Sequence, residues 1–121
     1  MATFTSRELE VMRILWTHGS LTPPEIQERH PRDLKNAALR SYLTILVEKG
    51  HVVRHRRGRA YVYSAKTRRE KSLRARLREL IQGYCDGSAS ALVCQLMKQE
   101  KLSAEELAAI RRLANEELER R

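Results

Sequence analysis

The feature that most constrains this fold lies between residues 33 and 64, where a helical pattern runs directly into the pattern of a two-stranded hairpin. The helical part ends at Glu48-Lys49-Gly50, and glycine favours the backbone conformation that closes a helix. The segments His51–Arg57 and Ala60–Ser64 are rich in Val and Tyr and flank Gly58-Arg59, which indicates a tight turn between antiparallel strands. This order predicts a helix that lies beside a two-stranded ribbon.

Two short helices are predicted before this stretch, because each has a recognisable start. Thr5 and Glu8 have the spacing of a capping box, and the helical pattern that follows stops at Gly19. Thr22 precedes two prolines and is expected to cap a second helix that runs to about His30. The apolar positions of the first helix are expected to face the core, and they are Leu9, Met12, Leu15 and Trp16.

The third helix, for which Asp33 is the expected cap, has two different faces. One face is apolar and consists of Leu39, Leu43, Leu46 and Val47. The opposite face is small and polar and consists of Asn36, Ala37, Arg40, Ser41 and Thr44. Small residues let a helix approach base edges in a major groove, and arginine can bind guanine through two hydrogen bonds. A solvated helix face without a binding role would have the same composition.

Four arginines lie within six residues at the predicted hairpin, and they are Arg54, Arg56, Arg57 and Arg59. Like charges this close repel one another, so the cluster brings no benefit to the fold unless an anion lies there. A solvated loop is the alternative interpretation. Because a cationic ribbon beside a helix can contact phosphates or enter the minor groove, helix and hairpin together predict binding to double-stranded DNA.

Two tyrosines in the second strand have two possible roles. Tyr61 and Tyr63 could stack on unpaired bases, as aromatic side chains do in proteins that bind single strands. A lone hairpin is too small a platform for such stacking, so we expect one or both tyrosines to pack with Val53 against the core.

Beyond Lys66 the sequence predicts three further helices. Asp86-Gly87 breaks the first, Ser88 is placed to cap the second, and Ser103 with Glu106 forms a capping box at the third. Each helix has an apolar face, but the segment is too short to bury all three faces alone, so we expect pairing with a second copy. The expected dimer interface consists of Leu73, Leu77, Leu80, Leu92, Leu96, Leu107, Ile110 and Leu113.

The predicted fold is mainly α with a small β-hairpin. It comprises a winged helix-turn-helix DNA-binding domain in residues 1–66 and a C-terminal helical dimerisation region in residues 67–121. Residues 1–66 carry 12 basic and 6 acidic side chains, whereas residues 97–121 carry 6 of each. The excess of positive charge in residues 1–66 favours binding to a polyanion, and the neutral balance of residues 97–121 favours contact with another protein. A homodimer would present two recognition helices to a palindromic operator.

Several function classes are not expected. The chain has no glycine-rich phosphate loop, no histidine cluster at metal-ligand spacing and no Ser, His and Asp at a recognisable spacing, which argues against an enzyme, a cofactor or a metal. Cys85 and Cys94 are too few and too far apart for a zinc site and are expected to pack between helices. The sequence has neither a membrane-length apolar run nor a secretory signal, which predicts a cytoplasmic protein without direct membrane binding.

The joint order of several motifs resembles the penicillinase-repressor family over nearly the whole chain. The motifs are Glu8-Leu9-Glu10-Val11-Met12 with Ile14-Leu15-Trp16, then Leu46-Val47-Glu48-Lys49-Gly50, then Gly58-Arg59-Ala60-Tyr61-Val62-Tyr63-Ser64, then Gly87-Ser88 with Ala91-Leu92-Val93. The family includes the repressors of beta-lactamase and methicillin-resistance genes, which link it to antibiotic resistance, and copper-responsive repressors. The resemblance implies a winged-helix homodimer that represses transcription and dimerises through C-terminal helices.

Three differences from the family pattern bear on function. Ala37-Ala38 replaces a Thr-Thr pair that is common in the family, so the familiar operator sequence does not carry over. In antibiotic-responsive members a membrane-sensor protease pathway cuts the repressor at an Asn-Phe bond, and that position matches Gln95-Leu96 here. The resemblance thus implies release from DNA by a cut that weakens the dimer. The paired Cys-x-Cys motifs of copper-responsive members are missing, so metal sensing by that route is not expected.

Two other functions share part of this pattern. An architectural or RNA-binding protein would have the same basic surface but would bind without sequence preference. A ligand-responsive winged-helix regulator would leave DNA when a small molecule binds, and such proteins usually have a longer chain with a pocket between domains. The sequence gives no obvious sign of a ligand pocket.

Overall fold

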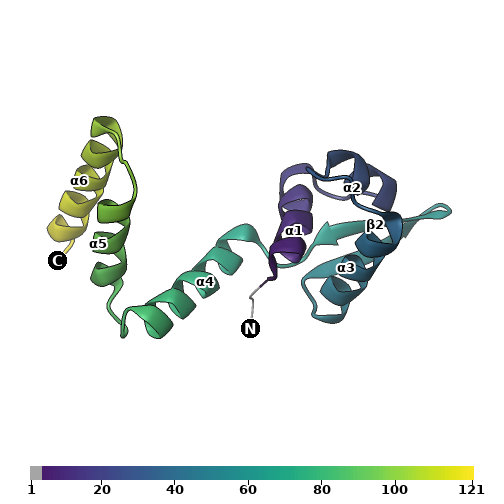
Figure 1. Cartoon of the computed structure of the whole chain (residues 1–121), viewed down its shortest axis with the longest axis horizontal. Helices are drawn as coiled ribbons and strands as arrows, with labels where there is room; N and C mark the ends of the chain where they lie inside the picture. Colours follow the sequence, from purple (N-terminus) through teal and green to yellow (C-terminus); the bar gives the residue numbers. More distant parts are fainter. Residues whose placement is uncertain (1–3) are drawn as a thin grey trace. The chain divides into compact units, whose positions relative to one another are not determined.

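The computed structural model describes residues 4–121 as six helices and one antiparallel hairpin (Figure 1). In chain order the elements are α1 (Ser6–His18), α2 (Pro23–Arg29), α3 (Asn36–Glu48), β1 (Val52–Arg57), β2 (Ala60–Ala65), α4 (Arg69–Tyr84), α5 (Ala89–Gln99) and α6 (Ala104–Glu119). The mainly helical fold with a small hairpin, expected from the sequence, is therefore confirmed. The chain divides into two compact units, Met1–Leu77 and Arg78–Arg121, so the first half of α4 belongs to the N-terminal unit.

The core of the N-terminal unit lies where the first three helices meet the hairpin. Its largest fully buried side chains come from α1, α2, α3 and the start of β1, and they are Val11, Met12, Leu15, Ile26, Leu39, Leu43, Leu46 and Val52. Leu21 extends the hairpin by one bridge, because its backbone donates to and accepts from the backbone of Tyr63 at 3.0 and 2.8 Å. Tyr63 is only 8 % exposed and joins the core. This bridge fixes the hairpin against the loop between α1 and α2.

The starts of the first two helices agree with the capping patterns in the sequence. Thr5 accepts a hydrogen bond from the Glu8 backbone at 3.1 Å, and the Glu8 carboxylate accepts one from the Thr5 backbone at 3.0 Å. Thr22 and Glu25 form the same reciprocal pair at the start of α2, where Pro23 occupies the first helical position. These pairs satisfy backbone donors that have no partner within a helix.

Three details of the sequence interpretation were wrong. Asp33 does not cap α3, which begins at Asn36 after Lys35, and no side chain caps it. The loop before α3 is held by α2, because the Gln27 side chain donates to the Leu34 carbonyl at 2.8 Å and Leu34 packs against the core. The helix therefore starts two residues later than an Asp33 cap would require.

The other two errors concern apolar residues that were expected in the core. Leu9 is 40 % exposed and Val47 is 36 % exposed. Val11 and Ile14, rather than Leu9, complete the buried face of α1. The apolar stripe of α3 is therefore narrower than expected and consists of Leu39, Leu43 and Leu46.

The segment after β2 is anchored to the N-terminal unit through Thr67. The Trp16 indole donates to the Thr67 carbonyl at 2.8 Å, and the Thr67 hydroxyl lies 2.8 Å from Nδ1 of His51. The His51 carbonyl accepts hydrogen bonds from the Lys66 and Thr67 backbones at 2.8 and 3.2 Å. The start of α4 is thus tied to both α1 and the residue that precedes β1.

The C-terminal unit consists of the end of α4 with α5 and α6. Ser88 caps α5, and Ser103 with Glu106 forms the expected capping box at α6. The helix break at Asp86-Gly87 is also confirmed, because both residues have positive φ angles of 48° and 83°. No residue from 78 to 121 is buried, although the structure describes all of them. Within residues 4–121 no helix is both long enough and apolar enough to cross a membrane.

Candidate nucleic-acid interface

One face of α3 is exposed to solvent. All five residues predicted to contact DNA from this helix are exposed, and they are Asn36, Ala37, Arg40, Ser41 and Thr44. Leu39, Leu43 and Leu46 hold the opposite side in the core. The Thr44 hydroxyl donates to the Arg40 carbonyl at 2.8 Å, so toward an external group it offers an acceptor and its methyl group.

The hairpin orders part of its arginine cluster around Tyr61. Arg54 pairs with Tyr63 across the strands and Arg56 pairs with Tyr61, so these four side chains lie on the same face of the hairpin. The guanidinium carbons of Arg54 and Arg56 lie 4.3 and 5.7 Å from the centre of the Tyr61 ring. The ring attracts both cations and offsets some of their mutual repulsion. Tyr61 stays 41 % exposed, so only Tyr63 fits the inward packing expected of the two tyrosines.

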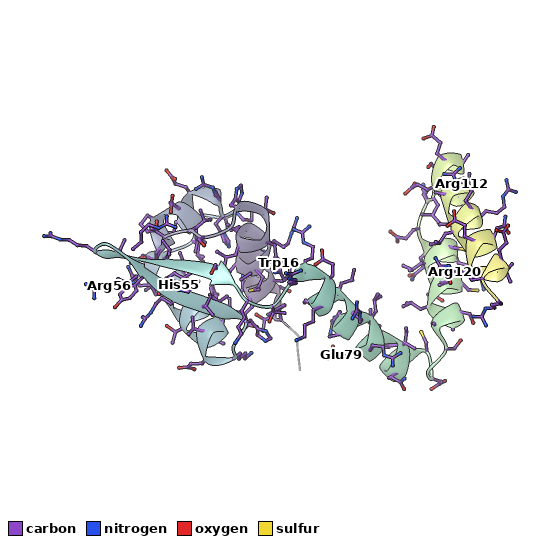
Figure 2. All side chains as sticks on the ribbon, turned by 180° about the vertical axis from the view of Figure 1, so that it is seen from behind. Trp16, His55, Arg56, Glu79, Arg112 and Arg120 are labelled. Carbon is purple, nitrogen blue, oxygen red and sulfur yellow. The ribbon has the colours of Figure 1, made fainter. Side chains whose placement is uncertain are left out.

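Of the remaining arginines, Arg57 ends β1 and Arg59 lies in the turn. Hydrogen bonds from Thr22 lower the pKa of the Glu25 carboxyl below its ordinary value, and the nearby charges of Arg29 and then Arg57 act in the same direction. Arg56 donates to the Gly58 carbonyl at 3.2 Å and so stiffens the turn. Figure 2 shows Arg56 and His55 on the hairpin, whereas Trp16 lies toward the start of α4.

A hollow of about 340 Å³ joins the helix to the hairpin. Arg40 of α3 and Arg59 of the turn both line it, so the structure brings together two of the predicted DNA-binding residues. The start of α2 and the two strand tyrosines supply the other walls, which are Thr22, Pro23, Pro24, Ala60, Tyr61 and Tyr63. Sequence reasoning assigned Thr22 only a capping role, because nothing local places α2 beside the hairpin.

The surface so defined carries arginines on α3 and on the hairpin, with a hollow between them. Its exposed guanidinium groups and small helix side chains can hold phosphates and reach base edges. The residues from 4 to 121 include no cluster of three or more His, Cys, Asp or Glu side chains that could hold a metal ion. The geometry thus brings exposed guanidinium groups of α3 and the hairpin turn to one surface.

The chain matches the penicillinase repressor family model over residues 4–116. It is 23 % identical to the penicillinase repressor of Bacillus licheniformis over 121 aligned residues, which cover 94 % of this chain and 91 % of that protein. It is also 23 % identical to an uncharacterized 16.5 kDa protein in the ptsI 3' region of Latilactobacillus sakei, with 90 % of this chain and 76 % of that protein covered.

Solved structures support the same fold. The solution structure of the DNA binding domain of the repressor BlaI has a TM-score of 0.52 at 25 % identity and covers 58 % of this chain and 88 % of that one. The YusO protein of Bacillus subtilis has a TM-score of 0.56 at 21 % identity and covers 98 % and 77 %. A mutant MarR from E. coli complexed with operator DNA has a TM-score of 0.52 at 22 % identity and covers 95 % and 76 %. Because the family model spans nearly all of its residues, this chain belongs to the penicillinase repressor family.

Proposed function

We propose that this protein is a transcriptional repressor that binds a palindromic double-stranded operator as a homodimer. In this proposal α3 lies in the major groove and reads bases through Asn36, Ala37, Arg40, Ser41 and Thr44. The arginines of the hairpin hold the phosphates beside the groove. The observation that carries the proposal is the hollow that Arg40 and Arg59 share, because one element then reads bases while the other fixes its register.

The positive charge of the N-terminal unit favours DNA binding over the alternative that the exposed face of α3 is only solvated. Four arginines project from a six-residue strand and the turn that follows it, and only Arg54 and Arg56 are near an aromatic ring. Arg57 has the Glu25 carboxylate nearby. A duplex would supply further anions to the cluster, and each phosphate contact would release a counterion. The family and the similarity to the DNA binding domain of BlaI support the same function.

The proposal of a homodimer rests on the C-terminal unit. Its apolar side chains remain exposed in the single chain, including Leu96 at 49 % and Leu113 at 58 %. Met97 of α5 and Leu107 and Ile110 of α6 line a shared hollow of about 430 Å³. A unit this short with no buried residue gains its core most simply from a second copy. We assign residues 67–121 to dimerisation and residues 1–66 to DNA binding.

Release from DNA is proposed to follow from loss of the dimer, since one half-site alone binds far more weakly than a tethered pair. The candidate position for a cut by a membrane-sensor protease pathway is Gln95-Leu96 in α5. Both residues are exposed in the single chain, which leaves the helical backbone and the partner subunit as the barriers to a protease.

The decisive experiment selects bound duplexes from a random-sequence pool with the full-length protein at physiological salt. A repressor should enrich an inverted repeat whose half-sites lie about one helical turn apart. The enriched duplex should compete against random duplex with an advantage of roughly a thousandfold or more. An architectural protein would enrich no motif, and an RNA-binding protein would prefer RNA competitor, so either result would overturn the proposal.

A further inference from the structure

The N-terminal unit contains an apolar cavity away from the proposed DNA surface. It lies between α1 and the first half of α4 and has a volume of about 280 Å³. Phe4, Leu9, Trp16 and Leu73 form its apolar walls, and Arg69 and Arg76 supply its charged groups. None of these residues belongs to α3 or to the hairpin. We propose that this cavity is a binding site for a small amphipathic anion with an aromatic or aliphatic body and a carboxylate.

The size and lining of the cavity define the body of the ligand. A dry cavity of roughly 150 Å³ lined by apolar side chains is large enough to bind benzene. The cavity here is larger than that, so it has room for one aromatic ring with a short chain. Ligand sites of this kind are mostly apolar and carry a few polar groups that orient the ligand.

The charged side chains around the cavity indicate which polar group the ligand carries. The lining residue on which the charge preference rests is Arg69, and no lining residue is acidic. The guanidinium of Arg69 lies over the Trp16 ring at 5.6 Å, so this cation is held at the edge of an aromatic wall. Guanidinium groups bind carboxylates through two parallel hydrogen bonds. An anion is therefore preferred over a neutral or cationic compound of the same shape.

Two of the walls, Trp16 and Phe4, are held in place before any ligand arrives. The Trp16 indole donates to the Thr67 carbonyl at 2.8 Å, which fixes the ring between α1 and the start of α4. Phe4 meets Trp16 edge to face with ring centres 6.1 Å apart. A preformed site loses less affinity to ordering on binding. A ligand here would contact α1 and α4 together, and its binding does not depend on the proposed DNA-binding function.

The experiment uses Trp16, the one tryptophan of the chain, as a reporter inside the proposed site. Full-length protein is titrated with 3-phenylpropionate, 3-phenylpropionamide and 3-phenylpropylamine, which share a body and differ in charge. Binding is followed by tryptophan fluorescence and by calorimetry. We expect saturable binding of the acid, about tenfold tighter than the amide, since one charged hydrogen-bonded pair contributes on the order of a factor of ten. The amine should bind most weakly.

Two variants and a matched control locate the site. Arg69→Gln should bring the affinities of acid and amide to within about twofold, whereas Arg68→Gln, at an exposed neighbour that does not line the cavity, should keep their ratio. Leu9→Asp should abolish binding of the acid while circular dichroism verifies the fold. Failure of all three compounds to bind, equal binding of all three, or a preference unchanged in Arg69→Gln would overturn the proposal.

Discussion

Arg40 and Arg59 line the same hollow but belong to different elements, a helix and a hairpin turn. Their contributions to DNA binding should differ accordingly. Arg40 lies on a helix whose opposite face is buried in the core, so its guanidinium can be held in register with one base pair. Arg59 lies next to Gly58 at the hairpin turn, where small movements still allow a contact with a flexible phosphate chain. We therefore expect the helix to supply sequence specificity and the turn to supply general affinity for DNA.

Replacing these two arginines separately tests that division. Arg40→Ala should cost about 1–3 kcal/mol on the selected operator and relax the preference at one base pair of each half-site. Arg59→Ala should weaken selected and random duplexes alike and lower the slope of log K against log salt by about one per phosphate contact. Fluorescence anisotropy at several salt concentrations measures both quantities. An Arg40→Ala protein with unchanged sequence preference would show that α3 does not read bases.

His51 should make the stability of the N-terminal unit depend on pH. Burial, followed by the nearby Lys49, lowers the pKa of His51 below its ordinary value of 6.5, although Glu8 acts in the opposite direction. The unfolded chain therefore binds a proton at a higher pH than the folded chain does. Stability is fully present above about pH 6.5 and falls as the pH drops toward the folded pKa.

Thermal unfolding between about pH 7.5 and about pH 5.5 measures this effect. His51→Gln should flatten the dependence of Tm on pH, even though it also removes the ring that meets Phe4 edge to face at 4.7 Å. His55→Gln is the matched control, because His55 is exposed on the hairpin and its removal should leave the slope intact. Equal slopes in the wild type and His51→Gln would assign the pH dependence to other groups.

At the scale of single elements, α3 differs from its neighbours in how it starts. α1, α2 and α6 begin with reciprocal capping boxes, whereas α3 begins after Lys35 and has no side-chain cap. A lysine at this end also places a positive charge against the positive end of the helix dipole. The proposed recognition helix is thus the least stabilised at its N-terminus among these four.

Lys35→Ser should raise the free energy of unfolding of the N-terminal unit by about 1 kcal/mol, because a serine oxygen can accept from the first backbone donors of α3. Urea unfolding followed by Trp16 fluorescence measures the change. Lys35→Ala serves as the control, since it removes the charge without adding an acceptor, and it should produce a smaller gain. If serine and alanine give equal stability, capping does not limit α3.

The sequence predicted those features that depend on residues close together in the chain. The capping boxes expected at Thr5 and Ser103 each need a partner three residues away, and both are confirmed. The cap expected at Thr22 is also confirmed, whereas the reciprocal hydrogen bond of Glu25 was not predicted. The start of α3 was missed because Gln27 and the core packing of Leu34 hold the preceding loop. A short stretch of sequence does not show which side chain from another helix or strand will contact it in the fold.

The candidate site likewise combines features that local sequence predicts with features that depend on residues far apart in the chain. The exposed face of α3 and the arginines of the hairpin could be read from periodicity and turn residues. The bridge of Leu21 to Tyr63 and the bond from Trp16 to Thr67 join residues far apart in the sequence, at 3.0 Å or less. These contacts place the hairpin beside α2 and complete the cavity next to α4, and neither consequence has a local signature.

At the scale of the whole molecule, the C-terminal unit should determine the oligomeric state. Sedimentation equilibrium of the full-length protein at micromolar concentration should give a dimer, because residues 78–121 contain no buried side chain within one chain. Ile110→Asp should yield a monomer, since Ile110 lies on the apolar side of α6 beside Leu107. Arg112→Asp is the control, because two positions along an α-helix turn a side chain to nearly the opposite side. A monomeric wild-type protein would contradict the dimer.

The last prediction connects this dimer to release from DNA. A chain that ends at Gln95 lacks α6 and the final part of α5, so it should be monomeric while every residue of the proposed DNA surface stays intact. Its affinity for the selected operator should fall by about a hundredfold to ten-thousandfold, the advantage that a tethered pair has over one module. Its affinity for random duplex should fall much less, because the arginines remain.

The same step can be followed in cells by measuring the intact mass of the protein before and after induction. A fragment ending near Gln95, present only after induction, would agree with the proposed cut. Cys94 is exposed beside that bond, so its oxidation offers a second route to a weaker dimer and would appear as added mass on a full-length chain. Full-length, reduced protein that no longer binds its operator would contradict both routes. That outcome would direct attention to the cavity between α1 and α4, because a ligand there leaves the covalent chain unchanged.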